Sequence, residues 1–168
     1  MLGAFEQRWI DFDHVDARNH ETWVALDRVR DPGNLGTIMR SADAVGASGL
    51  ILIGDCTDPY SVEAVRASMG AVFNTQISAC SESAFLKFAA SWQGRIVGTA
   101  LSASIDYRKA DYKRPLILLM GNERSRLTDN LMKVCGQLIK LPMLGRSDSL
   151  NLAVATGIVL YETMARGD

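Results

Sequence analysis

The sequence predicts an α/β fold in which helices cover both faces of a parallel sheet. Short apolar segments predict strands that are buried on both faces, since they lack the alternation of polar and apolar residues typical of a half-exposed strand. These segments alternate with stretches in which apolar residues recur at helical spacing, which is the pattern of repeated β–α units. Glycine and polar residues follow several of the apolar segments, and open parallel sheets bind ligands beyond the carboxyl ends of their strands.

Strands and helices are expected to alternate along most of the chain. The apolar segments predict strands over 23–26, 50–53, 72–77, 95–100, 115–120 and 138–141. Helical spacing and capping residues predict helices over 34–45, 61–69, 81–92, 128–135 and 149–162. Asn34 and Ser149 are the expected N-caps, because their side-chain oxygens can accept a hydrogen bond from a free backbone N–H of the first turn. The last helix carries an apolar stripe made of Leu150, Ala153, Val154, Ile158, Leu160 and Tyr161.

The composition is typical of a single globular domain. The 168 residues are 48% hydrophobic and 22% charged, and no apolar stretch reaches the length of a membrane span. Residues 1–21 are expected to form a polar lead-in without signal-peptide features, and residues 22–168 the single domain. The three cysteines form no metal-binding or disulfide pattern, so we expect reduced thiols and a cytoplasmic protein. A net charge of −1 argues against a protein that coats nucleic acid by charge alone.

Three polar clusters hold the residues best suited to chemistry, and the first lies at 34–40. Asn34 and Gly36 place a polar cap and bare backbone at the start of a helix, and Arg40 follows on the same face about one turn later. Such an arginine can hold a phosphate or polarise a hydroxyl. The alternative is an arginine on the solvated flank of an amphipathic helix.

The second and third clusters follow later apolar segments. In Gly121-Asn122-Glu123, the glycine admits close approach of a ligand and the two side chains offer donors and acceptors. A plain turn is the alternative. The third cluster is the loop 142–151, which includes Ser149 and Asn151 and has free backbone groups suited to a small polar ligand. An ordinary strand–loop–helix connection is the alternative there.

Several common chemistries have no matching motif. The sequence lacks G-x-G-x-x-G and G-x-x-x-x-G-K-[ST], which argues against a dinucleotide site and a P-loop. His14 and His20 lie outside the three clusters, so serine-hydrolase and zinc chemistry have no constellation and no metal site is expected.

Taken in order, the three clusters resemble the SpoU (TrmH) family of SPOUT RNA methyltransferases. The resemblance covers residues 22–166 and rests on N-x-G-x-x-x-R at 34–40, G-N-E at 121–123 and P-M-x-G-x-x-x-S-L-N at 142–151. It implies S-adenosylmethionine as methyl donor and a ribose 2′-hydroxyl of RNA as acceptor, with rRNA favoured over tRNA. It also implies a trefoil knot near the C-terminus and a homodimer with the active site at its interface.

The resemblance assigns roles to residues that match the motifs. It implies a catalytic set of Arg40, Asn34, Glu123, Ser149 and Asn151. It implies cofactor contacts from Thr99, Ala100, Leu101, Gly121, Asn122, Leu141, Met143 and Leu150. Arg40 would act on the 2′-hydroxyl, by lowering its pKa or holding the adjacent phosphate, because a guanidinium does not readily lose a proton.

The sequence departs from the family pattern after G-N-E, where the family usually has a glycine-rich stretch. Arg124-Ser125-Arg126 stands there instead, and either reshapes the loop over the pocket or adds phosphate contacts, the second of which we favour. Two alternative functions therefore stay open, a knotted RNA-binding dimer without catalysis and a tRNA 2′-O-methyltransferase. A nucleotide-binding metabolic enzyme would need a phosphate loop that the sequence lacks.

Overall fold

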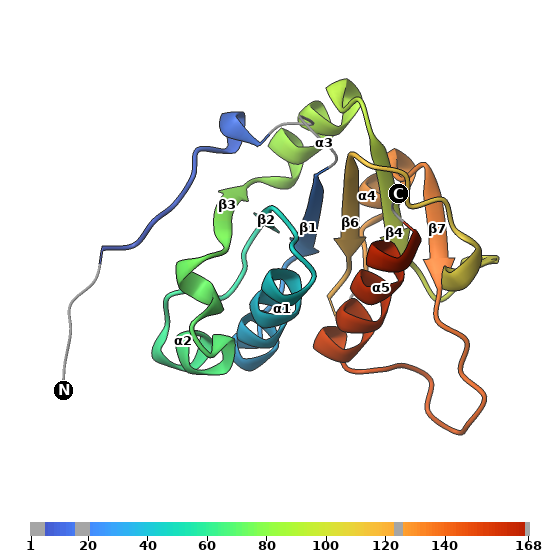
Figure 1. Cartoon of the computed structure of the whole chain (residues 1–168). Coiled ribbons are helices and arrows are strands. Elements are labelled where there is room, and N and C mark those ends of the chain that lie inside the picture. Colours follow the sequence, from blue (N-terminus) through green and yellow to red (C-terminus); the bar gives the residue numbers. More distant parts are fainter. Residues whose placement is uncertain (1–5, 16–20, 123–125, 167–168) are drawn as a thin grey trace.

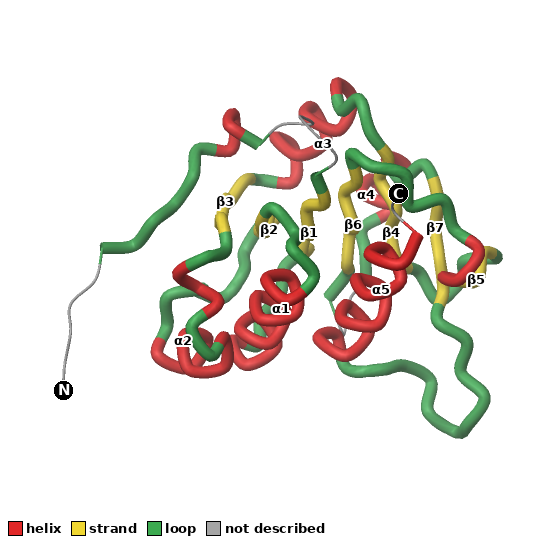
Figure 2. Tube along the Cα trace, viewed as in Figure 1, coloured by secondary structure: helices red, strands yellow, loops and turns green. Residues whose placement is uncertain are grey.

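A fully parallel sheet runs through the middle of the molecule, with helices on both faces (Figures 1 and 2). The computed structural model describes residues 6–15, 21–122 and 126–166, in which the sheet has seven strands in the order β3-β2-β1-β6-β4-β7-β5. The strands are β1 (Thr22–Asp27), β2 (Gly49–Ile53), β3 (Gln76–Cys80), β4 (Arg95–Thr99), β5 (Ile105–Asp106), β6 (Leu116–Met120) and β7 (Gln137–Lys140). The predicted fold class, α/β with a parallel sheet, is confirmed.

Two hydrophobic cores lie on opposite faces of the sheet. Helices α1 (Pro32–Ala44), α2 (Val62–Ser68) and α5 (Leu152–Arg166) cover one face, and α3 (Glu82–Ser91) and α4 (Asp129–Val134) cover the other (Figure 1). Successive residues of one strand serve opposite cores, since Val24 packs on the α1 side and Ala25 on the α3 side. Both faces of the central strands are therefore buried, which explains their uninterrupted apolar sequence.

Most predicted strands match the observed ones within a residue or two, but the strand expected over 72–77 is wrong. Residues 71–73 form a short 3-10 helix, η2 (Ala71–Phe73), and β3 begins only at Gln76. Met69 and Gly70 precede η2 with left-handed backbone angles, φ 51° and φ 94°, which turn the chain and end α2. Val72 is buried as part of this turn and not of the sheet.

Both predicted N-caps are also wrong. Helix α1 begins at Pro32 and is capped by Asp31, whose Oδ1 accepts a hydrogen bond from Asn34 N–H at 2.6 Å. Proline suits this first helical position because it needs no N–H partner there. Helix α5 begins at Leu152 and is capped by Asn151, whose Oδ1 accepts from the backbone N–H groups of Ala153 and Val154.

The apolar stripe predicted for the last helix does not face the core as a whole. Ala153 and Leu160 are buried, but Val154, Ile158 and Tyr161 are exposed. The buried face of α5 includes two threonines, Thr156 and Thr163, whose hydroxyls donate to carbonyls of their own helix at 2.7 Å. This internal pairing allows polar side chains to be buried while apolar ones remain outside.

The described part of the polar lead-in runs along the free edge of β3. Trp9 pairs with Ile77, and the N–H of Ile10 donates to the carbonyl of Ile77 at 2.9 Å. After the 3-10 helix η1 (Phe12–His14), Val15 is buried in the core on the α3 side. Covering an edge strand removes a row of unpaired backbone groups from contact with other chains.

None of the helices described combines the length and the apolarity needed to cross a membrane. A further short helix, η3 (Tyr107–Lys109), follows β5 at the opposite edge of the sheet.

Gly36 lies where α1 crosses α2. An ideal Cβ at this position would lie 2.3 Å from the carbonyl oxygen of Ala64 and 2.9 Å from the backbone nitrogen of Ser68. The expectation that Gly36 offers bare backbone to a ligand is therefore wrong, because the second helix occupies that space. Arg40 does not share this environment, since it is exposed.

We predict that Gly36→Ala lowers the free energy of unfolding by about 1–3 kcal/mol, because the added methyl group forces α1 away from the backbone of α2. Helix propensity alone would give the opposite sign, a gain of about 1 kcal/mol. Urea unfolding followed by circular dichroism measures the change. Gly145→Ala is the control, since no atom lies within 4 Å of an ideal Cβ there. Equal stability of the wild-type protein and Gly36→Ala would contradict the prediction.

Candidate functional site: a cavity at the carboxyl ends of the strands

Strands that are distant in sequence end side by side in the sheet. The register pairs Leu26 of β1 with Met120 of β6, and Thr99 of β4 with Ile139 of β7. The pairing of β4 with β6 places Gly98 beside Leu119, so Thr99 and Met120 end at the same level. The segments that follow β4, β6 and β7 therefore leave the sheet at one place, which is where open parallel sheets bind ligands.

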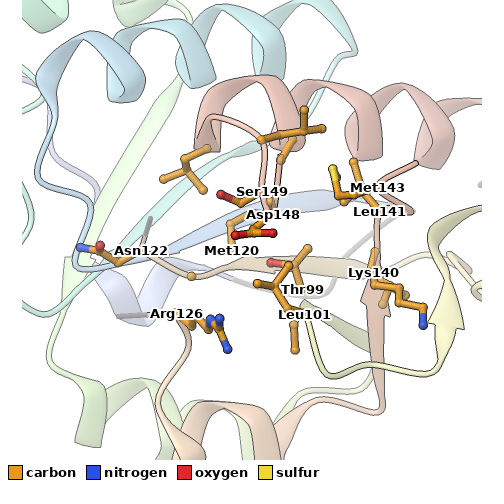
Figure 3. A pocket seen from close by; sticks show the side chains of 16 residues that line it. Thr99, Leu101, Met120, Asn122, Arg126, Lys140, Leu141, Met143, Asp148 and Ser149 are labelled. Carbon is orange, nitrogen blue, oxygen red and sulfur yellow. The ribbon is translucent and has the colours of Figure 1, made fainter. Parts of the chain in front are cut away.

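A cavity of about 230 Å³ lies between these three segments (Figure 3). Its wall combines apolar side chains, hydroxyls, an amide and three charged groups. The lining residues are Thr99, Ala100, Leu101, Met120, Gly121, Asn122, Arg126, Ile139, Lys140, Leu141, Met143, Asp148, Ser149, Leu150, Leu152 and Ala155. A small mixed cavity of this kind suits a compact ligand with both apolar and polar parts.

All eight residues expected to touch a cofactor line this one cavity. They come from three segments, 99–101, 121–122 and 141–150, which only the fold brings together. Their role in binding stays a prediction. Sequence reasoning missed Met120 at the end of β6 and Ile139 and Lys140 at the end of β7. It also missed Asp148 within the third motif, and Leu152 and Ala155 in the first turn of α5. Their positions next to the motifs are the signal that could have identified them.

After β6, Asn122 and Arg126 meet at the base of a loop. The backbone N–H of Arg126 donates to the carbonyl of Asn122 at 3.0 Å, and the two residues form an antiparallel bridge. Gly121 is required here, because an ideal Cβ would lie 2.5 Å from the backbone nitrogen of Leu127. The close approach to Gly121 is therefore made by the backbone of Leu127, whereas the sequence suggested a ligand there. Glu123 and Arg124, which were singled out from the sequence, lie outside the described residues.

The structure joins the first motif to the third. The Nδ2 group of Asn151 donates to Oδ1 of Asn34 at 2.9 Å, across 117 residues of sequence. Because Asn151 also caps α5, this contact fixes the start of α5 against the first turn of α1. Of the predicted catalytic residues, Ser149 lines the cavity, whereas Asn151 follows the lining residue Leu150 and holds Asn34 through this bond.

Arg40 stands apart from the cavity of its own chain. It is exposed on α1 and does not line the cavity. The neighbouring residues Thr37 and Ser41 line a second, open groove between α1 and α5, together with Val154 and Tyr161. Arg40, the arginine expected to act in the reaction, therefore lies beside the groove between α1 and α5.

Thiol and metal chemistry have little support among the described residues. Burial raises the pKa of the Cys56 thiol to about 11 and that of Cys135 to about 12, so both stay protonated near neutral pH. In the described ranges, no three His, Cys, Asp or Glu side chains gather closely enough to hold a metal ion. His14 is exposed, and His20 lies outside the described residues.

A parallel α/β domain with a mixed cavity at its strand ends defines a class of proteins that bind a small cofactor or substrate there. Residues 21–161 match the SpoU rRNA Methylase family, and the chain belongs to this family.

Known relatives are similar over nearly the whole chain. The chain is 35% identical over 170 residues to a 23S rRNA (uridine(2479)-2′-O)-methyltransferase from Streptomyces viridochromogenes, covering 98% of this chain and 59% of the relative. It is 35% identical over 157 residues to the 23S rRNA (guanosine-2′-O-)-methyltransferase RlmB of Vibrio parahaemolyticus, covering 92% of this chain and 63% of that protein.

A solved structure is similar as well. The AdoMet-bound rRNA methyltransferase from Sinorhizobium meliloti superposes with a TM-score of 0.93 at 50% sequence identity, covering 96% of this chain and 62% of that one. The chain therefore spans about three fifths of the length of these relatives.

Proposed function

We propose that this chain transfers a methyl group from S-adenosylmethionine to the 2′-hydroxyl of a ribose in RNA, with rRNA as the substrate. The observation that carries the proposal is the cavity at the strand ends, in which all eight residues expected to touch the cofactor meet. Membership of the SpoU family supports the same reaction, since the relatives are named as rRNA 2′-O-methyltransferases and a similar structure has AdoMet bound.

The wall of the cavity has the chemistry that this cofactor requires. Leu101, Met143 and Leu150 offer apolar surface for a flat adenine ring, and the Thr99 and Ser149 hydroxyls can pair with polar edges. Asp148 would attract the positive charge of the cofactor, and the two cations of the wall, Arg126 and Lys140, would attract its carboxylate (Figure 3). When bound, the cofactor supplies a methyl group on a sulfur that is already activated, so the protein mainly aligns the reacting atoms.

The 2′-hydroxyl has to lose its proton as the new bond forms, and we assign Arg40 to this step. The proton of the hydroxyl would pass to water, because a guanidinium does not readily lose its own proton and so is a poor base. It can lower the pKa of the hydroxyl by stabilising the developing negative charge, or hold the adjacent phosphate. Asn34 and Asn151 would keep the helix starts beside the site in place through their mutual hydrogen bond.

The C-terminal part would form the trefoil knot that the family resemblance implies. Support comes from the strand order, in which β4 lies between β6 and β7 although both follow it in sequence. The loop after β7 then passes the ends of β4 and β6 at Thr99 and Gly121, before α5 packs back against α1. General topology rules disfavour such threading, so the family resemblance and not the pattern of elements motivates this assignment.

A homodimer would explain the exposed apolar face of α5. Val154, Ile158, Tyr161 and Met164 are exposed by 52%, 37%, 53% and 46%, an unusual density of apolar side chains for one solvated helix. Leu150 belongs to the same stripe and lines the cavity, so this face reaches the rim of the site. A second copy seated here could offer its Arg40 to the cavity of the first. An RNA substrate would place the dimer in the cytoplasm.

We predict that the protein binds S-adenosylhomocysteine, the demethylated product, and that Leu150→Arg weakens this binding more than about tenfold. The substitution replaces an apolar side chain of the cavity wall with a longer, charged one, which would occupy the space and remove the apolar surface offered to the adenine ring. Titration calorimetry measures the dissociation constant without an RNA. Leu144→Arg is the matched control, since Leu144 lies in the same loop, is 99% exposed and does not line the cavity. A folded wild-type protein that binds no S-adenosylhomocysteine would favour the non-catalytic RNA-binding alternative.

Arg40→Ala is expected to lower methylation of rRNA by about 100-fold or more, because a charge that acts in the transition state is lost. Transfer of tritium from labelled S-adenosylmethionine to ribosomal RNA measures the rate. Binding of S-adenosylhomocysteine and the oligomeric state should be unchanged, since Arg40 does not line the cavity of its own chain and is not part of the apolar face of α5. Lys87→Ala, an exposed cation on α3 at the other face of the sheet, serves as the control. Loss of cofactor binding in Arg40→Ala would refute this assignment.

Ile158→Glu is expected to convert a dimer into monomers, because it places a carboxylate in the apolar face of α5. Sedimentation velocity measures the mass, and Val62→Glu, on the exposed side of α2, controls for added surface charge.

Mixing Arg40→Ala with Leu101→Arg, a variant with a damaged cavity wall, should restore methylation if one site uses residues of both copies. A monomeric wild-type protein, or mixtures that stay inactive, would contradict the shared site.

A further inference from the structure

Arg28 lies directly after β1 and makes polar contacts in three directions. Its Nε and one terminal nitrogen each donate to the Asp27 carboxylate at 2.8 Å, a bidentate pair. The same terminal nitrogen, Nη2, also donates to the carbonyl oxygen of Arg126 at 3.2 Å. The carbonyl oxygen of Arg28 itself accepts a hydrogen bond from Nδ2 of Asn122 at 2.6 Å.

These contacts fall on both sides of the loop that follows β6. Asn122 and Arg126 form the base of that loop and are bridged to each other, and both line the cavity. Arg28 thus contacts both residues of the loop base, Asn122 through its backbone carbonyl and Arg126 through its side chain.

The conformation of Arg28 is specific to this role. Its φ of 49° lies in the left-handed region, which a residue with a side chain adopts only when its surroundings hold it there. This backbone angle turns the carbonyl toward Asn122 while the backbone N–H still donates to Ile53 of the neighbouring strand at 2.9 Å. Gly54 leaves room for the arginine stem, since an ideal Cβ there would lie 3.2 Å from Cγ of Arg28.

Asp27 fixes the guanidinium. Its side chain is 1% exposed, and among the described residues Arg28 is the basic side chain paired with it. A buried carboxylate needs such a partner, because an unpaired charge in the interior is strongly unfavourable. The pairing in turn holds the fork of Arg28 in one orientation, which leaves a terminal N–H free to reach Arg126.

We propose that Arg28 is a positioning residue that holds the base of the Asn122–Arg126 loop against the end of β1, and so keeps the cofactor cavity in its binding shape. The inference rests on the proposed function, in that the ligand of the cavity is taken to be S-adenosylmethionine. Arg28 does not line the cavity and acts through the two residues that do. Arginine is required because the bond to Arg126 and the bidentate pair with Asp27 need more donors in a fixed plane than lysine offers.

Arg28→Lys separates this role from neutralisation of Asp27. Lysine keeps a positive charge beside the carboxylate but cannot form the planar fork that also reaches Arg126. The dissociation constant for S-adenosylhomocysteine should rise about tenfold, the size expected for one hydrogen bond from a charged group. Thermal unfolding should remain a single transition. Arg30→Lys is the matched control, because Arg30 pairs with Asp55 on the surface, where both side chains are largely exposed.

The double variant Asp27→Asn with Arg28→Met tests whether Arg28 serves only the buried charge. It removes both members of the ion pair, so the protein should fold with an unfolding temperature close to that of the wild type. If Arg28 positions the loop, S-adenosylhomocysteine binding stays at least about tenfold weaker in this stable variant. A double variant that is as stable as the wild type and binds S-adenosylhomocysteine equally tightly would overturn the inference.

The outcomes for the proposed function and for this inference are distinguishable. A folded wild-type protein that does not bind S-adenosylhomocysteine overturns the proposed function and this inference with it. Wild-type binding that is the same in Arg28→Lys, Arg30→Lys and the double variant overturns the role of Arg28 alone and leaves the proposed function intact.

Discussion

The parallel pairing of β1, β6, β4 and β7 is the constraint on which the site depends. Parallel strands point the same way, so their carboxyl ends meet at one edge of the sheet even when many residues separate them in sequence. The register aligns Thr99 with Ile139 and Leu26 with Met120. Because a slip of one residue would turn every side chain to the opposite core, the two buried faces hold this register in place.

Helix α5 carries residues of unexpected type on both its buried face and its exposed face. Its buried face accepts Thr156 and Thr163 because their hydroxyls pair with carbonyls of the same helix. Its outer face carries Val154, Ile158 and Tyr161, which find no cover within the described chain. Satisfied polar groups inside and uncovered apolar groups outside are what the proposed homodimer would require of this helix.

Fixed contacts between distant segments give the cavity its shape. The bond between Asn34 and Asn151 ties the start of α1 to the start of α5. The contacts of Arg28 tie the end of β1 to the loop after β6. Both ties originate between Arg28 and Asn34, from the end of β1 to the first turn of α1, so this short stretch connects the residues proposed for catalysis with the walls proposed for the cofactor. A site formed from loops requires such supporting contacts, because loops by themselves are mobile.

The sequence by itself determined the α/β class and the parallel sheet, and its resemblance to a known family pointed to eight of the sixteen residues that line the cavity as contacts of the cofactor. Buried parallel strands need uninterrupted apolar segments, and short motifs at strand ends mark a site wherever the strands lie. Only the tertiary structure decided the strand order, the caps at Asp31 and Asn151, and which face of α5 is buried. These depend on which segments pack together, and helical spacing alone cannot distinguish a face that meets the core from one that stays outside. The role of Gly36 and the contacts of Arg28 likewise come from neighbours that are distant in sequence, Ala64 and Arg126, which folding alone brings within contact.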